Sequence, residues 1–268
     1  MRIIISAIAL LLTITPASHG WYNQNLTTSG DWHTASNWSP GVVPGSEFPA
    51  ASGDFNSHGF IGQNRTVDIN TDATMWIMHL GDSATTTGTV NVNAGTFTIT
   101  GQMRGGRNNG DGVVNIASGA TLHSLGSWNA GGWNNNTGAN TTVTQDGNFT
   151  ANTTAYIAED GNGTHTINGG TFSSAGQLVI ADNGSGTFNI NGGTINTSSV
   201  IKNANSSATV NHSDGTWNNS GTWFELAPRG GATATYNFTG GTINQNGTQF
   251  IVGANGGDAN MIMSGGAD

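Results

Sequence analysis

The sequence has 268 residues, of which 42 are glycine and only 8% carry a charge, against roughly 25% in an ordinary soluble domain. Asparagine and threonine are also abundant, and with glycine they rank low as helix formers, which excludes a helical bundle or a Rossmann-type enzyme. The formal net charge of −9 leaves no basic surface for nucleic acid or for an anionic membrane. The absence of cysteine excludes disulfides and thiolate metal sites.

The apolar residues are few but evenly spread. Hydrophobic residues make up 35% of the chain, and Trp, Phe, Val and Ile occur throughout it. Disordered chains are depleted in these residues and rich in net charge. The composition therefore predicts a folded all-β protein with a thin core and many tight turns.

The first 20 residues have the pattern of a secretory signal peptide. Arg2 is followed by an apolar run over residues 3–14 and by small residues near position 20. The run is too short to span a bilayer comfortably, and no second candidate occurs. We expect residues 1–20 to be removed, the mature chain to begin at Trp21, and the protein to be secreted or held on a bacterial cell surface. The alternative is a buried N-terminal strand.

Residues 21–65 differ in composition from the rest and are expected to form an N-terminal cap. They contain Trp32 and Trp38 and all but one of the mature chain's prolines. An open end of a repeat protein must be covered. Trp32 and Trp38 are therefore predicted to close the first coil.

Residues 66–268 repeat with a period of about 24, the sequence pattern of a solenoid. The clearest copies lie at residues 164–172 and 187–195, and the last copy is incomplete at Asp268. Around the turn at Gly193, Phe188, Ile190 and Ile195 alternate with polar residues, which places them on one side of two strands joined by a Gly-Gly corner.

The same residue types recur at the same offsets in successive copies. The alternative all-β fold, an antiparallel meander, would not require this recurrence. The pattern predicts a right-handed parallel β-solenoid of about eight coils, ~40 Å long. Outward Asn and Thr are expected to form polar ladders along the stack.

Three departures from the repeat carry structural predictions. Thr142 and Thr144 stand where the apolar pair is expected, and His212 replaces another inward residue, so those rungs should be loose or shifted by one residue. The insertion at residues 128–136 is expected to project as a loop.

The segment Trp32-His33-Thr34-Ala35-Ser36-Asn37-Trp38-Ser39-Pro40-Gly41, with the following Thr-Phe-Asn-Ile-Asn-Gly-Gly-Thr-Ile repeats, resembles a group of bacterial exported β-solenoid proteins. The group includes PEP-CTERM-sorted surface proteins and autotransporter passengers with associated β-strand repeats. The resemblance covers nearly all of the mature chain and implies a fold and a location rather than an activity. A C-terminal anchor commonly follows such repeats, so we expect either a longer protein or an open end that stacks on another molecule.

Asp160 and Asp182 are the candidate catalytic carboxylates, because they lie in corresponding loops of adjacent coils. Stacking would bring them within ~5 Å, the separation of a retaining glycosidase pair, and they could also share a cation. The favoured interpretation is that Glu159-Asp160-Gly161 and Asp182-Asn183-Gly184 simply make turns. A lyase would need a basic residue beside the acids, and neither Lys202 nor Arg229 is expected in that loop row. Arg104 and Arg107 are expected in a solvated turn.

Carbohydrate binding needs exposed aromatic residues, and Trp128, Trp133, Trp217 and Trp223 could form a stripe, although Trp217 is at an inward position. Of these, Trp128 and Trp133 are the candidate carbohydrate-binding residues. No metal site is expected, because the seven histidines include no i,i+4 pair, and His165 should pack in a ladder. No cofactor is expected.

The sequence thus favours a non-catalytic structural or adhesive protein of the cell surface or extracellular matrix. The expected partners are a polysaccharide or another copy bound through the C-terminal coil, without nucleic acid or membrane insertion. The alternatives are a polysaccharide lyase or glycoside hydrolase, and a carbohydrate-binding module.

Overall fold

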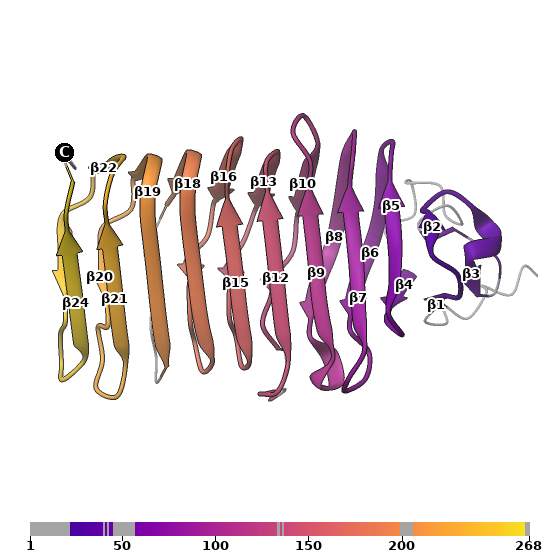
Figure 1. The fold of residues 1–268 in the computed structure, drawn as a ribbon, viewed down its shortest axis with the longest axis horizontal. Helices are drawn as coiled ribbons and strands as arrows, with labels where there is room; N and C mark the ends of the chain where they lie inside the picture. The colour runs from indigo at the N-terminus through magenta and orange to yellow at the C-terminus, as the bar shows by residue number, and fades with distance from the viewer. Residues whose placement is uncertain are drawn as a thin grey trace, which may run out of the picture.

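Parallel strands stacked coil upon coil form the molecule. The computed structural model describes residues 22–39, 41, 43–44, 57–132, 135, 137–198 and 206–265. Its strands lie side by side along one axis, from the indigo N-terminal region to the yellow C-terminal coil (Figure 1). This confirms an all-β fold with a parallel β-solenoid of about eight turns. Within the described part, the only helical segments are short 3-10 turns, Ala35–Asn37 and Arg107–Asn109.

Each complete coil contributes strands to three ladders, which we call the first, second and third faces. The first face is the longest, and its neighbouring strands pair in parallel. It consists of β5 (Arg65–Ile69), β7 (Thr87–Val92), β9 (Asp111–Ile116), β12 (Asn140–Gln145), β15 (Asn162–Ile167), the first halves of β18 (Ser185–Thr197) and β19 (Ser207–Asn219), β21 (Thr233–Phe238) and β24 (Asp258–Met263).

The second face follows after the corner of each coil. It consists of the start of β6 (Ala73–Leu80) and of β8 (Thr96–Gly105), β10 (Thr121–Ser124), β13 (Asn148–Ala151), β16 (Thr171–Ser174), the second halves of β18 and β19, and β22 (Thr242–Gln245).

The third face has the shortest strands. It consists of β4 (Ser57–Ile61), the ends of β6 and β8, β11 (Trp128–Asn129), β14 (Ala155–Tyr156) and β17 (Leu178–Val179). A separate pair, β20 (Trp223–Leu226) and β23 (Gln249–Val252), forms a two-stranded parallel sheet in the last coils.

Apolar side chains at equivalent positions stack inside the coils, as the alternation predicts. Phe188 pairs with Val210 and Ile190 with His212 on the first face, while Ile195 pairs with Trp217 on the second. All of these side chains are buried. Each rung therefore buries its apolar residues against the rungs before and after it, which is the packing that a solenoid needs for stability.

The corners need glycine for a steric reason. Gly170 has a φ of +65°, and a Cβ added there would lie 1.8 Å from the carbonyl oxygen of Gly147 in the preceding coil. A side chain would thus meet the backbone of the neighbouring coil as well as strain its own. The glycine corner of the repeat is confirmed.

Of the two irregular rungs, one is shifted by one residue and the other keeps its register as far as His212. Val143 and Gln145 point inward and are buried, paired with Val114 and Ile116, so the polar side chains of Thr142 and Thr144 face outward. This is the one-residue shift that the sequence left open. His212 keeps its inward position and forms a hydrogen bond with the Tyr236 hydroxyl at 2.9 Å.

The expected projecting loop at residues 128–136 is wrong at its start. Trp128 and Asn129 form β11, which pairs with β8 and β14 and is buried. Trp128 packs edge-on against Phe149 at 4.8 Å between ring centroids, because its indole fills the core between the second and third faces. Residues 133, 134 and 136 lie outside the described residues.

The N-terminal cap is built from three strands joined to the stack. β1 (Tyr22–Leu26) pairs in parallel with β4 and antiparallel with β3 (Trp38–Ser39), while β2 (Gly30–Asp31) pairs in parallel with β5. Trp32 and Trp38 are buried, 1% and 2% exposed, and meet edge-to-face at 5.0 Å. Trp32 also lies 5.1 Å from Phe97 in the core, so the two indoles cover the first coil as predicted.

Candidate functional site

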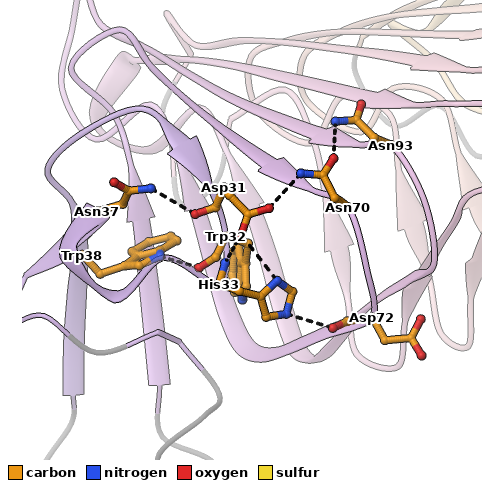
Figure 2. Close-up of polar contacts among 8 residues, drawn as sticks. All are labelled: Asp31, Trp32, His33, Asn37, Trp38, Asn70, Asp72 and Asn93. Atoms are coloured by element: carbon orange, nitrogen blue, oxygen red, sulfur yellow. Dashed lines mark hydrogen bonds and ion pairs between the residues drawn. The ribbon is translucent and has the colours of Figure 1, made fainter.

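Polar contacts fasten the cap to the first face (Figure 2). Asn70 donates to Oδ2 of Asp31 at 2.8 Å, and Asn93, one coil further, donates to Asn70 at 3.0 Å. The His33 ring lies 3.1 Å from the carbonyl oxygen of Asp72, and the Trp38 indole N–H donates to the carbonyl of Trp32 at 2.9 Å. These bonds satisfy polar groups within the cap, so we assign them a structural role.

The outward positions of the first two faces carry ladders of amide side chains, as predicted. On the first face Asn237 donates to Asn211 and Asn211 to Asn189, both at 2.8 Å. On the second face Asn244 donates to Asn218 at 2.8 Å, and Asn218 donates to Asn196 at 3.0 Å. The coils are thus joined by side-chain as well as backbone hydrogen bonds.

The third face departs from this Thr and Asn pattern. One column runs through paired residues of successive coils, and several of its members are ionisable. Its members are Phe60, His79, Arg104, Asn129, Tyr156 and Val179. This column gathers perturbed titratable groups on one side of the solenoid, where a functional site would be sought.

Two histidines share a hydrogen bond at one end of this column. Nδ1 of His58 lies 3.1 Å from Nε2 of His79, and both side chains are buried. Burial, with Arg104 and Arg107 nearby, lowers the pKa of His58 to about 4, and the same influences lower the pKa of His79 to about 2. The pair is therefore neutral at pH 7.

The prediction of a solvated turn is wrong for Arg104, which lies within strand β8, but a turn does begin at Arg107, the first residue of the 3-10 segment. Arg104 is the second-last residue of β8 and donates from Nε to Oε1 of Gln102 at 2.9 Å, and burial lowers its pKa. Arg107 stacks its guanidinium over Phe60 at 5.1 Å from the ring centroid. Arg104 thus belongs to the third-face column, and Arg107 packs on Phe60 of the same face.

The candidate carboxylates gather at the other end of the column, but in a different register from the expected one. The amide of Asn183 donates to the carbonyl of Glu159, and that of Asp182 to the carbonyl of Ala158. Asp182 is therefore paired with Glu159, whereas Asn183 is paired with Asp160 and donates to its Oδ1 at 3.2 Å. Asp160 also accepts the backbone N–H of Asn135 at 2.8 Å, which is the behaviour of a turn residue.

Glu159 has the most perturbed carboxyl of the cluster. Burial first, and then the charges of Asp160 and Asp182, raise its pKa to about 7, while a hydrogen bond from Asn129 and the charge of Arg104 oppose the rise. Burial and Asp160 also raise the pKa of Asp182.

Two arginines act electrostatically on these acids. The charge of Arg229 lowers the pKa of Asp182 and the charge of Arg104 lowers that of Glu159, in both cases against the larger effect of burial. Lys202 lies outside the described residues.

Neither candidate aromatic is placed as an exposed carbohydrate platform. Trp128 is 0% exposed, so the expectation that it binds a sugar is wrong. Trp133 lies outside the described residues. Trp217 is buried as expected, and Trp223, the remaining member of the possible aromatic stripe, is 45% exposed on β20. His165 is buried among Phe149, Phe172 and Phe188, which confirms its ladder position.

The C-terminal coil presents a partly apolar surface. Phe250, Ile262 and Met263 are 39%, 45% and 58% exposed. Met263 pairs with Phe238 and so occupies an inward column in the last described coil.

Two hollows follow the stack. One of about 290 Å³ lies beside Asp160 and is lined further by Asn162, Asn183, Ser185 and Ser207. The other, of about 260 Å³, is lined by hydroxyls and amides that include Ser173, Asn196, Asn218 and Ser220. Both hollows cross several coils, and Asp160 is the one ionisable residue among the described residues that line them.

No family model, curated protein or solved structure matches this chain. Among the described residues, no cluster of three or more His, Asp or Glu could hold a metal ion. In the same part of the chain, no helix is long and apolar enough to cross a membrane.

The sequence reasoning missed His58, His79, Asn129 and Tyr156. These residues lie on third-face strands of two to eight residues, and the two-residue strands β11 and β14 are too short to show a polar-apolar alternation. The remaining signal is spacing, since His79, Arg104 and Asn129 follow one another at one-coil intervals.

Proposed function

We propose that this chain is an exported, non-catalytic β-solenoid that serves a bacterial cell surface or extracellular matrix as a structural or adhesive component. The observation that carries the proposal is the repetition of uncharged Thr, Asn and Ser along the outer positions of the first face, joined by amide ladders over successive coils. An enzyme concentrates its chemistry at one place, whereas a structural rod repeats one surface.

Export is proposed on the sequence of residues 1–20, whose basic start, short apolar run and small residues are typical of a signal peptide. The partners we propose are a polysaccharide on the polar faces and another copy of the chain on the C-terminal coil. The partly exposed Phe250 and Met263 support the second contact, because burying them against another rung would be favourable.

The test of the non-catalytic assignment is an activity screen with acidic and neutral polysaccharides. We expect no hydrolysis or elimination. A matched variant is the Asp160→Asn, Asp182→Asn double substitution, which keeps the size of both turn residues. Activity that this variant loses with an unchanged circular dichroism spectrum would refute the structural function, and activity that it retains would refute it while locating the chemistry elsewhere.

The second candidate function is a polysaccharide lyase or glycoside hydrolase. The observation that favours it is the raised pKa of Glu159, which keeps a protonated carboxyl near pH 7 beside Asp160 and Asp182. Such a carboxyl could donate a proton to a leaving oxygen, with a neighbouring carboxylate on the other side of the bond. Glu159→Gln would abolish activity under this function and would leave adhesion unchanged under the first.

A further inference from the structure

The middle of the first face is a regular uncharged surface. Five neighbouring strands, β12, β15, β18, β19 and β21, keep their register across this face without a bulge, since the shifts in β18 and β19 occur only after Ile190 and His212. Their outward positions form three columns, which we call the Thr/Asn array. The columns are Asn140, Asn162, Ser185, Ser207 and Thr233; Thr142, Thr164, Thr187, Thr209 and Thr235; and Thr144, Thr166, Asn189, Asn211 and Asn237.

The array has a fixed two-dimensional spacing. Neighbouring coils lie ~4.8 Å apart, and outward residues two positions apart on one strand lie ~6.7 Å apart. The backbone of each strand is held on both sides by parallel neighbours, and the amide ladder from Asn237 to Asn189 holds the side chains of one column. A partner would therefore meet a surface that is already ordered, which lowers the entropic cost of binding.

Hydrogen-bonding capacity remains after the ladder is formed. An Asn amide can donate two and accept two hydrogen bonds, and Asn211 uses one of each within its column. In the described part of the chain, the hydroxyls of Thr164, Thr187 and Thr209 form no hydrogen bond with the protein. The array thus offers donors and acceptors outward, and each threonine adds a methyl group for apolar contact.

The chemistry of the array identifies its partner as neutral. No ionisable side chain occurs among its 15 outward positions in the five strands. A net charge of −9 opposes the approach of acidic polymers. Along one edge, Asn162, Ser185 and Ser207 also line the hollow of about 290 Å³, so the flat array continues into a polar groove that follows the stack.

We propose that the Thr/Asn array binds the surface of an insoluble neutral polysaccharide, with repeated hydroxyls meeting the hydroxyl and amide groups and sugar C–H groups meeting the threonine methyls. The proposal rests on the adhesive function above and names the face and the partner's chemistry. The many weak contacts act together because they belong to one rigid body.

The experiment compares two double variants in the same pair of coils. Thr187→Lys, Thr209→Lys places long charged side chains on the array, and the matched control Thr194→Lys, Thr216→Lys places them on the second face of β18 and β19. The probes are washed suspensions of microcrystalline cellulose, chitin and insoluble starch, and binding is measured by depletion of the protein from the supernatant. Circular dichroism checks that both variants fold.

We expect the wild-type chain and the control to bind at least one of the three polymers alike, and the array variant to bind it at least about tenfold more weakly. Equal binding by both variants would overturn the array assignment and leave the adhesive function standing. Failure of the wild-type chain to bind any of the three polymers would overturn the choice of partner. Degradation of a polymer would instead refute the non-catalytic function.

Discussion

Asn91 donates from Nδ2 to Oδ1 of Asp68 at 2.8 Å, and Asn115 continues the same ladder by donating to Asn91 at 2.9 Å. Asn70 donates to Asp31 in the same direction, and Asn140 to Asp111. A carboxylate only accepts hydrogen bonds, so it can end a row of amides whose N–H groups point toward the N-terminus. Because the acceptor is charged, the terminal bond is also stronger than an amide-amide bond.

The first prediction separates the inward column from the outward ladder. Ile190→Asp would place a carboxylate in the core between Ile167 and His212 and should cost about 3–5 kcal/mol. Asn189→Asp, one residue away, loses only the bond that it donates to Thr166 and keeps the one that it accepts from Asn211, at a cost of about 1 kcal/mol. Urea unfolding measures both free energies, and equal losses would contradict the assignment of faces.

The core of the first two faces could be predicted because stacking repeats one physical requirement in every coil. Val90, Phe188 and Val210 each follow polar residues by the same alternation, so their sequence positions specify their direction. The shifted rung at Val143 and Gln145 is also visible in the sequence, since Thr142 and Thr144 occupy positions where the repeat has apolar residues.

The third face could not be predicted in this way. β11, β14 and β17 have two residues each, too few to show a period, and their column changes from Asn129 to Tyr156 to Val179. Trp128 was assigned to a loop because its segment is longer than the repeat, although the indole fills the core. The electrostatic influence of Arg104 on Glu159 and of Arg229 on Asp182 connects residues far apart in the sequence, and repeat spacing alone did not indicate it.

The second prediction concerns the glycine corners. In Gly170→Ala the new Cβ would lie 1.8 Å from the Gly147 carbonyl oxygen, so the neighbouring coil must move, and we expect a loss of more than about 3 kcal/mol. The matched control is Gly119→Ala, where φ is also positive, at +82°, but no atom lies within 4 Å of the added Cβ. That variant should lose only about 1 kcal/mol, the cost of the backbone conformation.

Thermal unfolding of the two glycine variants beside the wild-type chain gives the comparison. Similar melting temperatures for Gly170→Ala and Gly119→Ala would mean that the corners tolerate a side chain, which would contradict the close stacking of neighbouring coils at Gly170.

The third prediction restores the repeat at a buried polar pair. Nε2 of His165 lies 3.0 Å from Oε1 of Gln145, and Nδ1 of His165 is buried without a hydrogen-bond partner. Phe188 occupies the column of His165 one coil later, and Ile190 occupies the column of Gln145 two coils later. The double variant His165→Phe, Gln145→Ile should therefore be about 1 kcal/mol more stable at pH 7, since it removes an unsatisfied group. Gln145→Ile alone should be less stable than the wild-type chain, because it leaves both imidazole nitrogens unpaired.

Acid should increase the advantage of that double variant. Burial lowers the pKa of His165 to about 3, below its ordinary value of 6.5. Between these values the unfolded chain binds a proton that the folded chain does not, so the wild-type protein loses stability as the pH falls from 6.5 toward 3. Urea unfolding at pH 7 and pH 5 should show a larger difference at pH 5, and a smaller one would contradict the assignment.

The last prediction uses Glu159, whose pKa shift has the opposite sign. Its pKa rises from 4.5 to about 7 in the folded chain because of burial and the nearby Asp160 and Asp182. From pH 4.5 upward the unfolded chain releases this proton while the folded chain keeps it, so the contribution of Glu159 to stability is complete below 4.5 and declines until pH 7. Glu159→Gln stays neutral and avoids the decline. The melting temperature of this variant relative to the wild-type chain should rise between pH 4.5 and pH 8. Asp160→Asn should reduce the effect, because it removes the neighbouring charge that raises the pKa of Glu159 most. A difference that does not change with pH would show that Glu159 is ionised in the folded protein, which would also remove the observation that favours the enzymatic alternative.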